Sequence, residues 1–369
     1  MEYRDYRGQQ VSRLGMGAMR LPCQDGETFG ANIDYAPAEA IIDRAIAGGI
    51  TYFDTAYVYH GGNSESFLGK ALVSRYPRDS FTLATKFNLR AEPDFEKTFE
   101  TQLERLQTDY IDFYLLHAVM DNSAEGYLAS GCIDYFQEQK ERGRIKNLGF
   151  SSHASPAVLR DFLTKASWDF TQIQLNYLDW KYSTAREEYE ILEAAGVPVV
   201  VMEPCRGGKL ANLTPAVNEM LRAVHPDWSI ASWAFRWLRT LPQVQVVLSG
   251  MNTPEQVDDN VATFSDPVAL SAEDERVLWE ACEAYHTELV VPCTECRYCV
   301  EGCPMQIDIP AMLAKYNRFR LGSGGALKET LELEGGMAAD CVGCNQCVDV
   351  CPQGIDTPAI LAEIAEKLA

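Results

Sequence analysis

Short apolar segments alternate with longer segments of helical period over residues 1–285. The short segments are rich in β-branched residues, as buried strands are, while the longer segments place apolar residues on one helical face. This alternation predicts consecutive β-α units of a parallel sheet. Eight strands are expected, near Leu14–Ala18, Thr51–Asp54, Thr82–Lys86, Tyr110–Leu116, Ile145–Ser151, Phe170–Asn176, Val197–Met202 and Val244–Ser249.

Eight such units predict an α/β fold of the TIM (β/α)8 barrel type, whose active site forms at the C-terminal ends of the strands. Polar residues end or follow seven of the eight predicted strands: Asp54, Lys86, His117, Ser151, Ser152, Gln172, Asn176, Glu203, Ser249 and Gly250. One buried charge at a strand end is more often a structural ion pair. Core packing would not place polar residues on so many strands, so we expect a site there.

Eight cysteines form two runs of the spacing C-x-x-C-x-x-C-x-x-x-C-P, the bacterial ferredoxin pattern for 4Fe-4S clusters. The runs are Cys293, Cys296, Cys299 and Cys303 before Pro304, and Cys341, Cys344, Cys347 and Cys351 before Pro352. The fourth cysteine normally serves the other cluster. We therefore assign Cys351 to the first cluster and Cys303 to the second. Zinc is the alternative, but it normally binds two pairs of ligands, which does not fit three plus one.

The segments that follow Cys303 and Cys351 repeat one another. In each copy an aspartate, Asp308 or Asp356, is placed to cap a helix that has a proline in its first turn. The duplication predicts a small all-helical ferredoxin-like domain at residues 286–369, after a barrel at residues 1–285.

The formal charge of -21 disfavours nucleic acid and acidic membrane surfaces as partners. No apolar run approaches the ~20 residues of a membrane-spanning helix. The N-terminus lacks the pattern of a signal peptide, so we expect a cytoplasmic protein. Twelve cysteines in a reducing compartment favour metal ligation or redox chemistry over disulfides.

Several motifs resemble the aldo-keto reductase family, and with the cysteine runs they resemble its members that carry a C-terminal ferredoxin domain. The motifs are Phe53–Tyr59, Ser64–Glu65, Thr85–Lys86, Asp109–His117, Leu148–Ser152 and Thr253–Asn260. The resemblance implies a catalytic tetrad of Asp54, Tyr59, Lys86 and His117. It also implies a small-molecule carbonyl or alcohol substrate.

The chemistry of carbonyl reduction agrees with these roles, because negative charge develops on the carbonyl oxygen. Tyr59 would give the proton, and a nearby ammonium on Lys86 would make the phenol a better acid. Asp54 would hold Lys86 charged, and His117 would orient the carbonyl.

The resemblance also implies a nucleotide site for NAD(P)H. Ser151, Ser152 and Gln172 would bind the nicotinamide carboxamide, and Met202 would cover the ring. The segment from Gly250 to Asn260 would hold the adenosine phosphate, and we assign Glu203, Arg206, Ser249 and Gln256 to the same site. Gly250 and Gln256 stand where NADPH-dependent members carry Lys and Arg. Either NADH is preferred, Arg206 or Lys209 supplies the charge, or the nucleotide is not nicotinamide, in which case a flavin is possible.

Iron-sulfur clusters pass single electrons, whereas carbonyl reduction takes two. The leading hypothesis is an oxidoreductase whose clusters exchange electrons with a redox partner protein. One alternative is an electron-transfer protein that uses the barrel as a docking scaffold. Another is an ordinary NAD(P)H carbonyl reductase with structural clusters.

Overall fold

The structure is a computed structural model that describes residues 1–24, 26–27, 29–288, 291–320 and 326–369. The chain divides into two compact units. The first holds Met1–Cys205 and Ala231–Ser271, and the second holds Arg206–Ile230 and Ala272–Ala369. Among the described helices, none combines the length and the apolar character needed to cross a bilayer.

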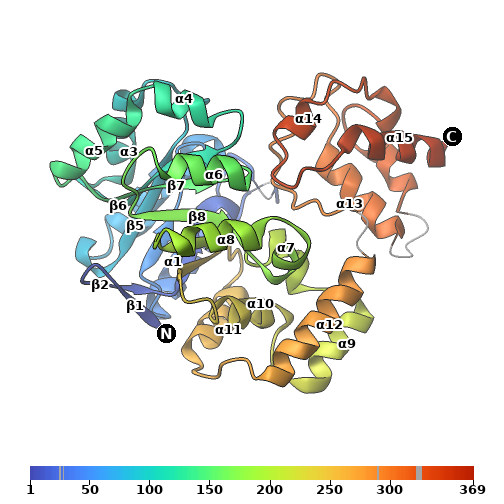
Figure 1. The fold of residues 1–369 in the computed structure, drawn as a ribbon, viewed down its shortest axis with the longest axis horizontal. Helices are drawn as coiled ribbons and strands as arrows, with labels where there is room; N and C mark the ends of the chain where they lie inside the picture. The colour runs from blue at the N-terminus through green and yellow to red at the C-terminus, as the bar shows by residue number, and fades with distance from the viewer. Residues whose placement is uncertain (25, 28, 289–290, 321–325) are drawn as a thin grey trace. The chain divides into compact units, whose positions relative to one another are not determined.

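A closed parallel barrel forms the first unit (Figure 1). Its strands are β3 (Leu14–Gly17), β4 (Tyr52–Asp54), β5 (Thr82–Phe87), β6 (Ile111–Val119), β7 (Ile145–Ser152), β8 (Phe170–Gln174), β9 (Val199–Met202) and β10 (Val244–Ser249). They follow one another around the barrel in chain order, and β10 closes it against β3. All eight predicted strands are confirmed. The interior is filled by large side chains such as Tyr52, Phe113 and Phe170, so the barrel is a packed core rather than a pore.

Helices connect the strands of the first unit. They are α1 (Tyr35–Ala47), α2 (Asn63–Leu68), α3 (Phe95–Leu106), α4 (Ala124–Ala129), α5 (Cys132–Glu141), α6 (Pro156–Leu163), α7 (Tyr177–Tyr182), α8 (Ala185–Ala194), α10 (Ile230–Leu238) and α11 (Pro254–Ser265). Asn176, expected at the end of a strand, instead caps α7, where its side chain accepts a hydrogen bond from Asp179 N at 2.9 Å. An Asn side chain satisfies the first amides of a helix, which explains why the strand stops earlier.

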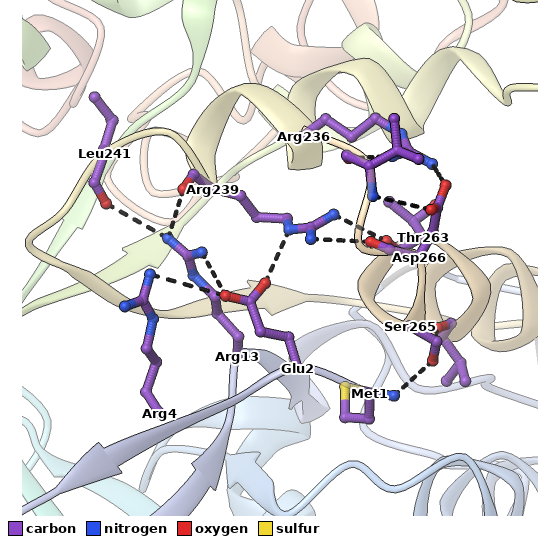
Figure 2. Close-up of polar contacts among 12 residues, drawn as sticks. Met1, Glu2, Arg4, Arg13, Arg236, Arg239, Leu241, Thr263, Ser265 and Asp266 are labelled. Carbon is purple, nitrogen blue, oxygen red and sulfur yellow. Dashed lines mark hydrogen bonds and ion pairs between the residues drawn. The ribbon is translucent and has the colours of Figure 1, made fainter. Parts of the chain in front are cut away.

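An antiparallel hairpin that the sequence pattern did not reveal precedes the barrel, formed by β1 (Tyr3–Tyr6) and β2 (Gln9–Ser12). Figure 2 shows the polar network beside it. Arg13, only 2% exposed, donates to Glu2 Oε1 at 2.9 Å, and Arg239 donates to Glu2 Oε2 at 2.9 Å. Burial lowers the pKa of Arg13 to about 10. Because Arg13 precedes β3, this network lies at the N-terminal end of the strands, opposite the expected site.

Helices are the regular secondary structure of the second unit over its described residues, and loops connect them. It contains α9 (Pro215–Val224), α12 (Ala272–Glu288), α13 (Ile309–Arg320), α14 (Gln346–Asp349) and α15 (Thr357–Leu368), with short 3-10 turns at Arg206–Ala211, Lys328–Glu332 and Ala338–Asp340. Helices α9 and α12 pack side by side (Figure 1). The two predicted aspartate caps are confirmed. Asp308 Oδ1 accepts from Ala311 N at 3.3 Å, and Asp356 Oδ1 accepts from Ala359 N at 3.2 Å.

Candidate active site and cluster cavities

A buried ion pair lies at the C-terminal ends of β4 and β5. Lys86 Nζ donates to Asp54 Oδ1 at 2.5 Å and to the backbone carbonyl of Thr55 at 2.7 Å. Asp54 is the last residue of β4 and is in register with Ala84, so Lys86 lies two residues further along the neighbouring parallel strand β5. The other carboxylate oxygen, Asp54 Oδ2, is buried and has no hydrogen-bond partner among the described residues.

Tyr59 and His117 complete a group of four side chains. Tyr59 begins a 3-10 turn just after β4, and Lys86 Nζ lies 5.0 Å from the centre of its ring. The His117 ring, carried by β6, stands edge-on to Tyr59 with ring centres 5.7 Å apart. The structure therefore brings together all four residues of the expected tetrad.

Burial dominates the electrostatics of this group. It raises the pKa of Asp54 and lowers the pKa of Lys86, while the attraction between the two charges opposes both effects. Burial and the nearby Lys86 ammonium hold the pKa of His117 well below its ordinary value. A neutral imidazole at His117 is thus the stable state near neutral pH.

The residues expected to bind a nicotinamide carboxamide lie on β7 and β8. Ser151 Oγ accepts a hydrogen bond from Ala118 N at 2.7 Å, which leaves its hydroxyl hydrogen for another acceptor. Gln172 Nε2 lies 3.6 Å from Met202 Sδ, while Gln172 Oε1 is buried without a hydrogen-bond partner in the described part of the chain. An unpaired buried acceptor fits the amide hydrogens of a carboxamide. Ser152 Oγ accepts from Ala154 N at 3.2 Å.

The segment after β10 is ordered by its own side chains. Asn260 Nδ2 donates to Ser249 Oγ at 2.9 Å, and Gln256 Oε1 accepts from Asn252 N at 2.8 Å. Gln256 N in turn donates to Thr253 Oγ1 at 3.3 Å, which caps α11. The hydrogen bonds of Gln256 are thus local to this loop, and its neutral side chain offers no positive charge to a nucleotide phosphate.

Arg20, to which the sequence pattern assigned no role, covers Gly250. A Cβ atom at Gly250 would meet Arg20 Cδ at 3.1 Å, and Arg20 Nη2 lies 3.4 Å from Glu203 Oε1. The other Glu203 oxygen is buried without a partner among the described residues. Arg20 follows β3 with no motif around it, so only the closure of the barrel between β10 and β3 reveals that it stands at this position.

Arg206 and Lys209, considered as sources of charge for the nucleotide, fall in the second unit. There Arg206 Nη2 donates to Gln353 Oε1 at 2.8 Å, and Lys209 Nζ pairs with Glu295 Oε1 at 2.7 Å. Glu295 lies between two cysteines of the first run, and Gln353 lies two residues after Cys351. Both cations are thus engaged by the cysteine segments.

The eight cysteines of the two runs line two hollows in the second unit. One hollow is bordered by Cys293, Cys296, Cys299 and Cys351. The other is bordered by Cys303, Cys341, Cys344 and Cys347. Cys347 also borders the first hollow. The second hollow thus has three cysteines of the second run and Cys303 of the first, and the first hollow has three cysteines of the first run with Cys347 and Cys351 of the second. Three cysteines of one run beside the last cysteine of the other run are the ligand set of a two-cluster ferredoxin, whereas zinc normally binds two pairs of ligands.

The closed parallel barrel, with Asp54, Lys86, His117 and Tyr59 gathered at the C-terminal ends of its strands, is the architecture of a class of oxidoreductases. The chain belongs to the aldo/keto reductase family, which it matches over residues 13–278, and residues 292–355 match the 4Fe-4S dicluster domain. The solved structure of the aldo-keto reductase AKR11C1 from Bacillus halodurans (holo form) is similar, with a TM-score of 0.61 and 28% identity. That similarity covers 76% of this chain and 96% of AKR11C1.

Two curated relatives have comparable similarity. The uncharacterized oxidoreductase YqkF of Bacillus subtilis (strain 168) is 28% identical over 286 residues, which cover 68% of this chain and 86% of YqkF. The L-galactose dehydrogenase of Arabidopsis thaliana is 27% identical over 291 residues, which cover 73% of this chain and 89% of that enzyme.

Proposed function

We propose that the barrel interconverts a small-molecule carbonyl and its alcohol with NAD(P)H, and that two 4Fe-4S clusters exchange electrons with a redox partner protein. The observation that carries the proposal is the Lys86 ammonium, held 2.5 Å from Asp54 and 5.0 Å from the ring centre of Tyr59. When bound, the nicotinamide supplies or accepts the hydride. The side chains of the protein transfer the proton to and from the substrate oxygen.

Tyr59 donates its hydroxyl proton to the substrate oxygen as negative charge develops there. The ammonium of Lys86 stabilises the phenolate that remains, and Asp54 keeps that ammonium in place. In the alcohol-to-carbonyl direction the phenolate takes the proton back. No metal ion is needed for this proton transfer.

His117 serves as a hydrogen-bond donor to the same oxygen. Its pKa lies well below the ordinary value because of burial, so the ring is neutral and offers an N–H rather than a labile proton. The rings of His117 and Tyr59 lie edge-on with their centres 5.7 Å apart, and this proximity supports the proposal that both donate to one substrate oxygen. The oxygen is thereby held while Tyr59 transfers its proton.

The two hollows support the proposed cluster sites, because the eight cysteines of the two runs lie at their borders. Iron-sulfur clusters pass one electron at a time. We place the division between the barrel and the cluster domain between residues 285 and 286, and the protein in the cytoplasm, where its thiols stay reduced.

The test begins with anaerobic purification and analysis of bound cofactors. The holoprotein is then titrated with NADH, NADPH and reduced ferredoxin while cluster absorbance and carbonyl reduction are followed. We expect NAD(P)H-dependent carbonyl reduction that is lost in Tyr59→Phe, with nucleotide binding retained. Unchanged turnover in this variant would refute the role of Tyr59.

The same titration separates the alternatives. Clusters that none of the donors reduces would indicate a structural role. Clusters that are reduced in a protein without any carbonyl reduction would indicate an electron-transfer protein.

A further inference from the structure

Glu65, on α2, is a completely buried carboxylate behind the tetrad. Its Oε1 accepts from Thr85 Oγ1 at 2.6 Å and from Gln102 Nε2 at 2.6 Å, and its Oε2 accepts from Arg105 Nη1 at 3.2 Å. A buried charge is tolerated only when it is paired and hydrogen-bonded. These donors, from β5 and α3, provide that compensation.

The network reaches Lys86 through its backbone. Gln102 Nε2 also lies 3.1 Å from the carbonyl oxygen of Lys86, and Gln102 Oε1 accepts from Tyr114 OH at 2.6 Å, which fixes the orientation of the amide. Thr85 precedes Lys86 on β5. Glu65 therefore anchors the strand segment from which the ammonium projects.

The same network reaches the segment that carries Tyr59. Arg105 Nη1 lies 3.4 Å from the carbonyl oxygen of Tyr57, and the guanidinium stands 4.7 Å from the centre of the Tyr57 ring. Tyr57 is two residues before Tyr59. Glu65 and Arg105, a partly buried ion pair, are thus connected both to the segment that carries Tyr59 and to the strand that carries Lys86.

Glu65 also influences Lys86 electrostatically. Four side chains from four elements influence the Lys86 ammonium: Asp54 from β4, Tyr59 from its 3-10 turn, Glu65 from α2 and His117 from β6. The negative charge of Glu65 raises the pKa of Lys86 against the effect of burial. Arg105, on the far side of Glu65, partly neutralises that influence.

We propose that Glu65 is a positioning residue which, with Arg105, holds Lys86 and the Tyr59 segment in register and balances their charges for proton transfer. This inference rests on the proposed carbonyl chemistry. A merely structural ion pair would stabilise the fold without affecting proton loss from the Tyr59–Lys86 pair.

The test compares the holoprotein with Glu65→Gln, Arg105→Gln and the double variant. The phenol of Tyr59 is titrated by NMR of 13Cζ-labelled tyrosine, with Tyr59→Phe to assign the signal, so no turnover is needed. Glu65→Gln leaves Arg105 uncompensated, and added positive charge promotes proton loss. We expect the midpoint of the first deprotonation to fall by about one pH unit.

Arg105→Gln should move the deprotonation in the opposite direction, and the double variant should return toward the wild type. The alkaline limb of carbonyl reduction should move together with the NMR midpoint. Above this limb, Glu65→Gln should therefore be about tenfold slower than the wild type if its midpoint falls by about one pH unit. Should Glu65→Gln not fold, the higher midpoint in Arg105→Gln alone tests the inference.

Asp112→Asn is the matched control. Asp112 is a buried carboxylate, 3% exposed, whose Oδ2 pairs with Arg78 at 2.7 Å near the start of β6. It should lose stability without moving the midpoint. Equal midpoints in Glu65→Gln, Arg105→Gln and the wild type would overturn the inference. Absence of any carbonyl reduction in the wild type, with the changes in NMR midpoint present, would instead refute the proposed function alone.

Discussion

The ammonium of Lys86 lies 2.5 Å from Oδ1 of Asp54, and the two side chains are 0% and 4% exposed. Charges so completely removed from water depend on each other. When one partner of such a pair is deleted, the other is left as an uncompensated buried charge, which is far more destabilising than removal of both.

We therefore expect Asp54→Asn and Lys86→Met each to destabilise the barrel by about 3–5 kcal/mol. The double variant should be more stable than either single variant, because it leaves no unpaired charge. Thermal unfolding followed by circular dichroism measures the difference. Additive losses in the double variant would show that the two charges do not stabilise each other.

The buried His117 predicts sensitivity to acid. Its pKa in the folded protein lies well below the value of about 6.5 that it has when unfolded. The unfolded state therefore binds more protons between these two values, so this contribution to stability is present above pH 6.5 and is lost as the pH falls. Denaturant unfolding at a series of pH values should show a steeper loss of stability below pH 6.5 in the wild type than in His117→Gln.

A parallel slope in both proteins would assign the acid sensitivity to other groups. His153 is the first to examine, because burial lowers its pKa to about 4. His153→Gln is thus the companion variant for this experiment.

The borders of the two hollows predict crossed ligation of the clusters. Cys303 borders the same hollow as Cys341 and Cys344, so Cys303→Ala should damage the second cluster. Iron content and the electron paramagnetic resonance spectrum of the reduced protein are the measurements. The spectrum of Cys303→Ala should resemble that of Cys344→Ala and differ from that of Cys296→Ala. The reverse resemblance would show that each run binds its own cluster.

Because Arg20 contacts Gly250, we predict that the Arg20 guanidinium supplies the positive charge for the 2′-phosphate of NADPH. Arg20→Gln should weaken NADPH binding about tenfold or more, since hydrogen bonds to charged groups contribute about 1.5–3 kcal/mol. NADH binding should weaken less, because NADH lacks the 2′-phosphate. Isothermal titration of both nucleotides gives the comparison. Equal affinity for NADPH in the variant and the wild type would show that Arg20 does not bind the 2′-phosphate.

Elements that are encoded by a pattern within a short stretch of sequence could be predicted. The barrel strands are short, apolar and β-branched, and the spacing of the cysteines specifies cubane ligands within a few residues of chain. The hairpin of β1 and β2 was missed because each strand has only four residues and their burial does not alternate clearly. Asn176 was placed in a strand because a polar residue after an apolar run gives no sign of whether it ends a strand or caps a helix.

The proximity of these four residues was predictable, because strand order places Asp54, Lys86 and His117 at one end of the barrel, and the motif after β4 adds Tyr59. The supporting residues were not. Glu65 and Arg105 lie 40 positions apart in sequence and meet only where α2 packs against α3. Arg20 and Gly250 meet only because β10 pairs with β3.

The sequence by itself determined the barrel, the ferredoxin-like pattern of cysteines and the types of side chain at the strand ends, since these depend on periodicity and short spacing. Tertiary structure alone decided which buried charges compensate one another, which cysteines border each hollow and which cation stands beside Gly250. Those relationships are set by contacts between segments far apart in the chain, where Coulomb interaction and exclusion of water act through space rather than along the sequence.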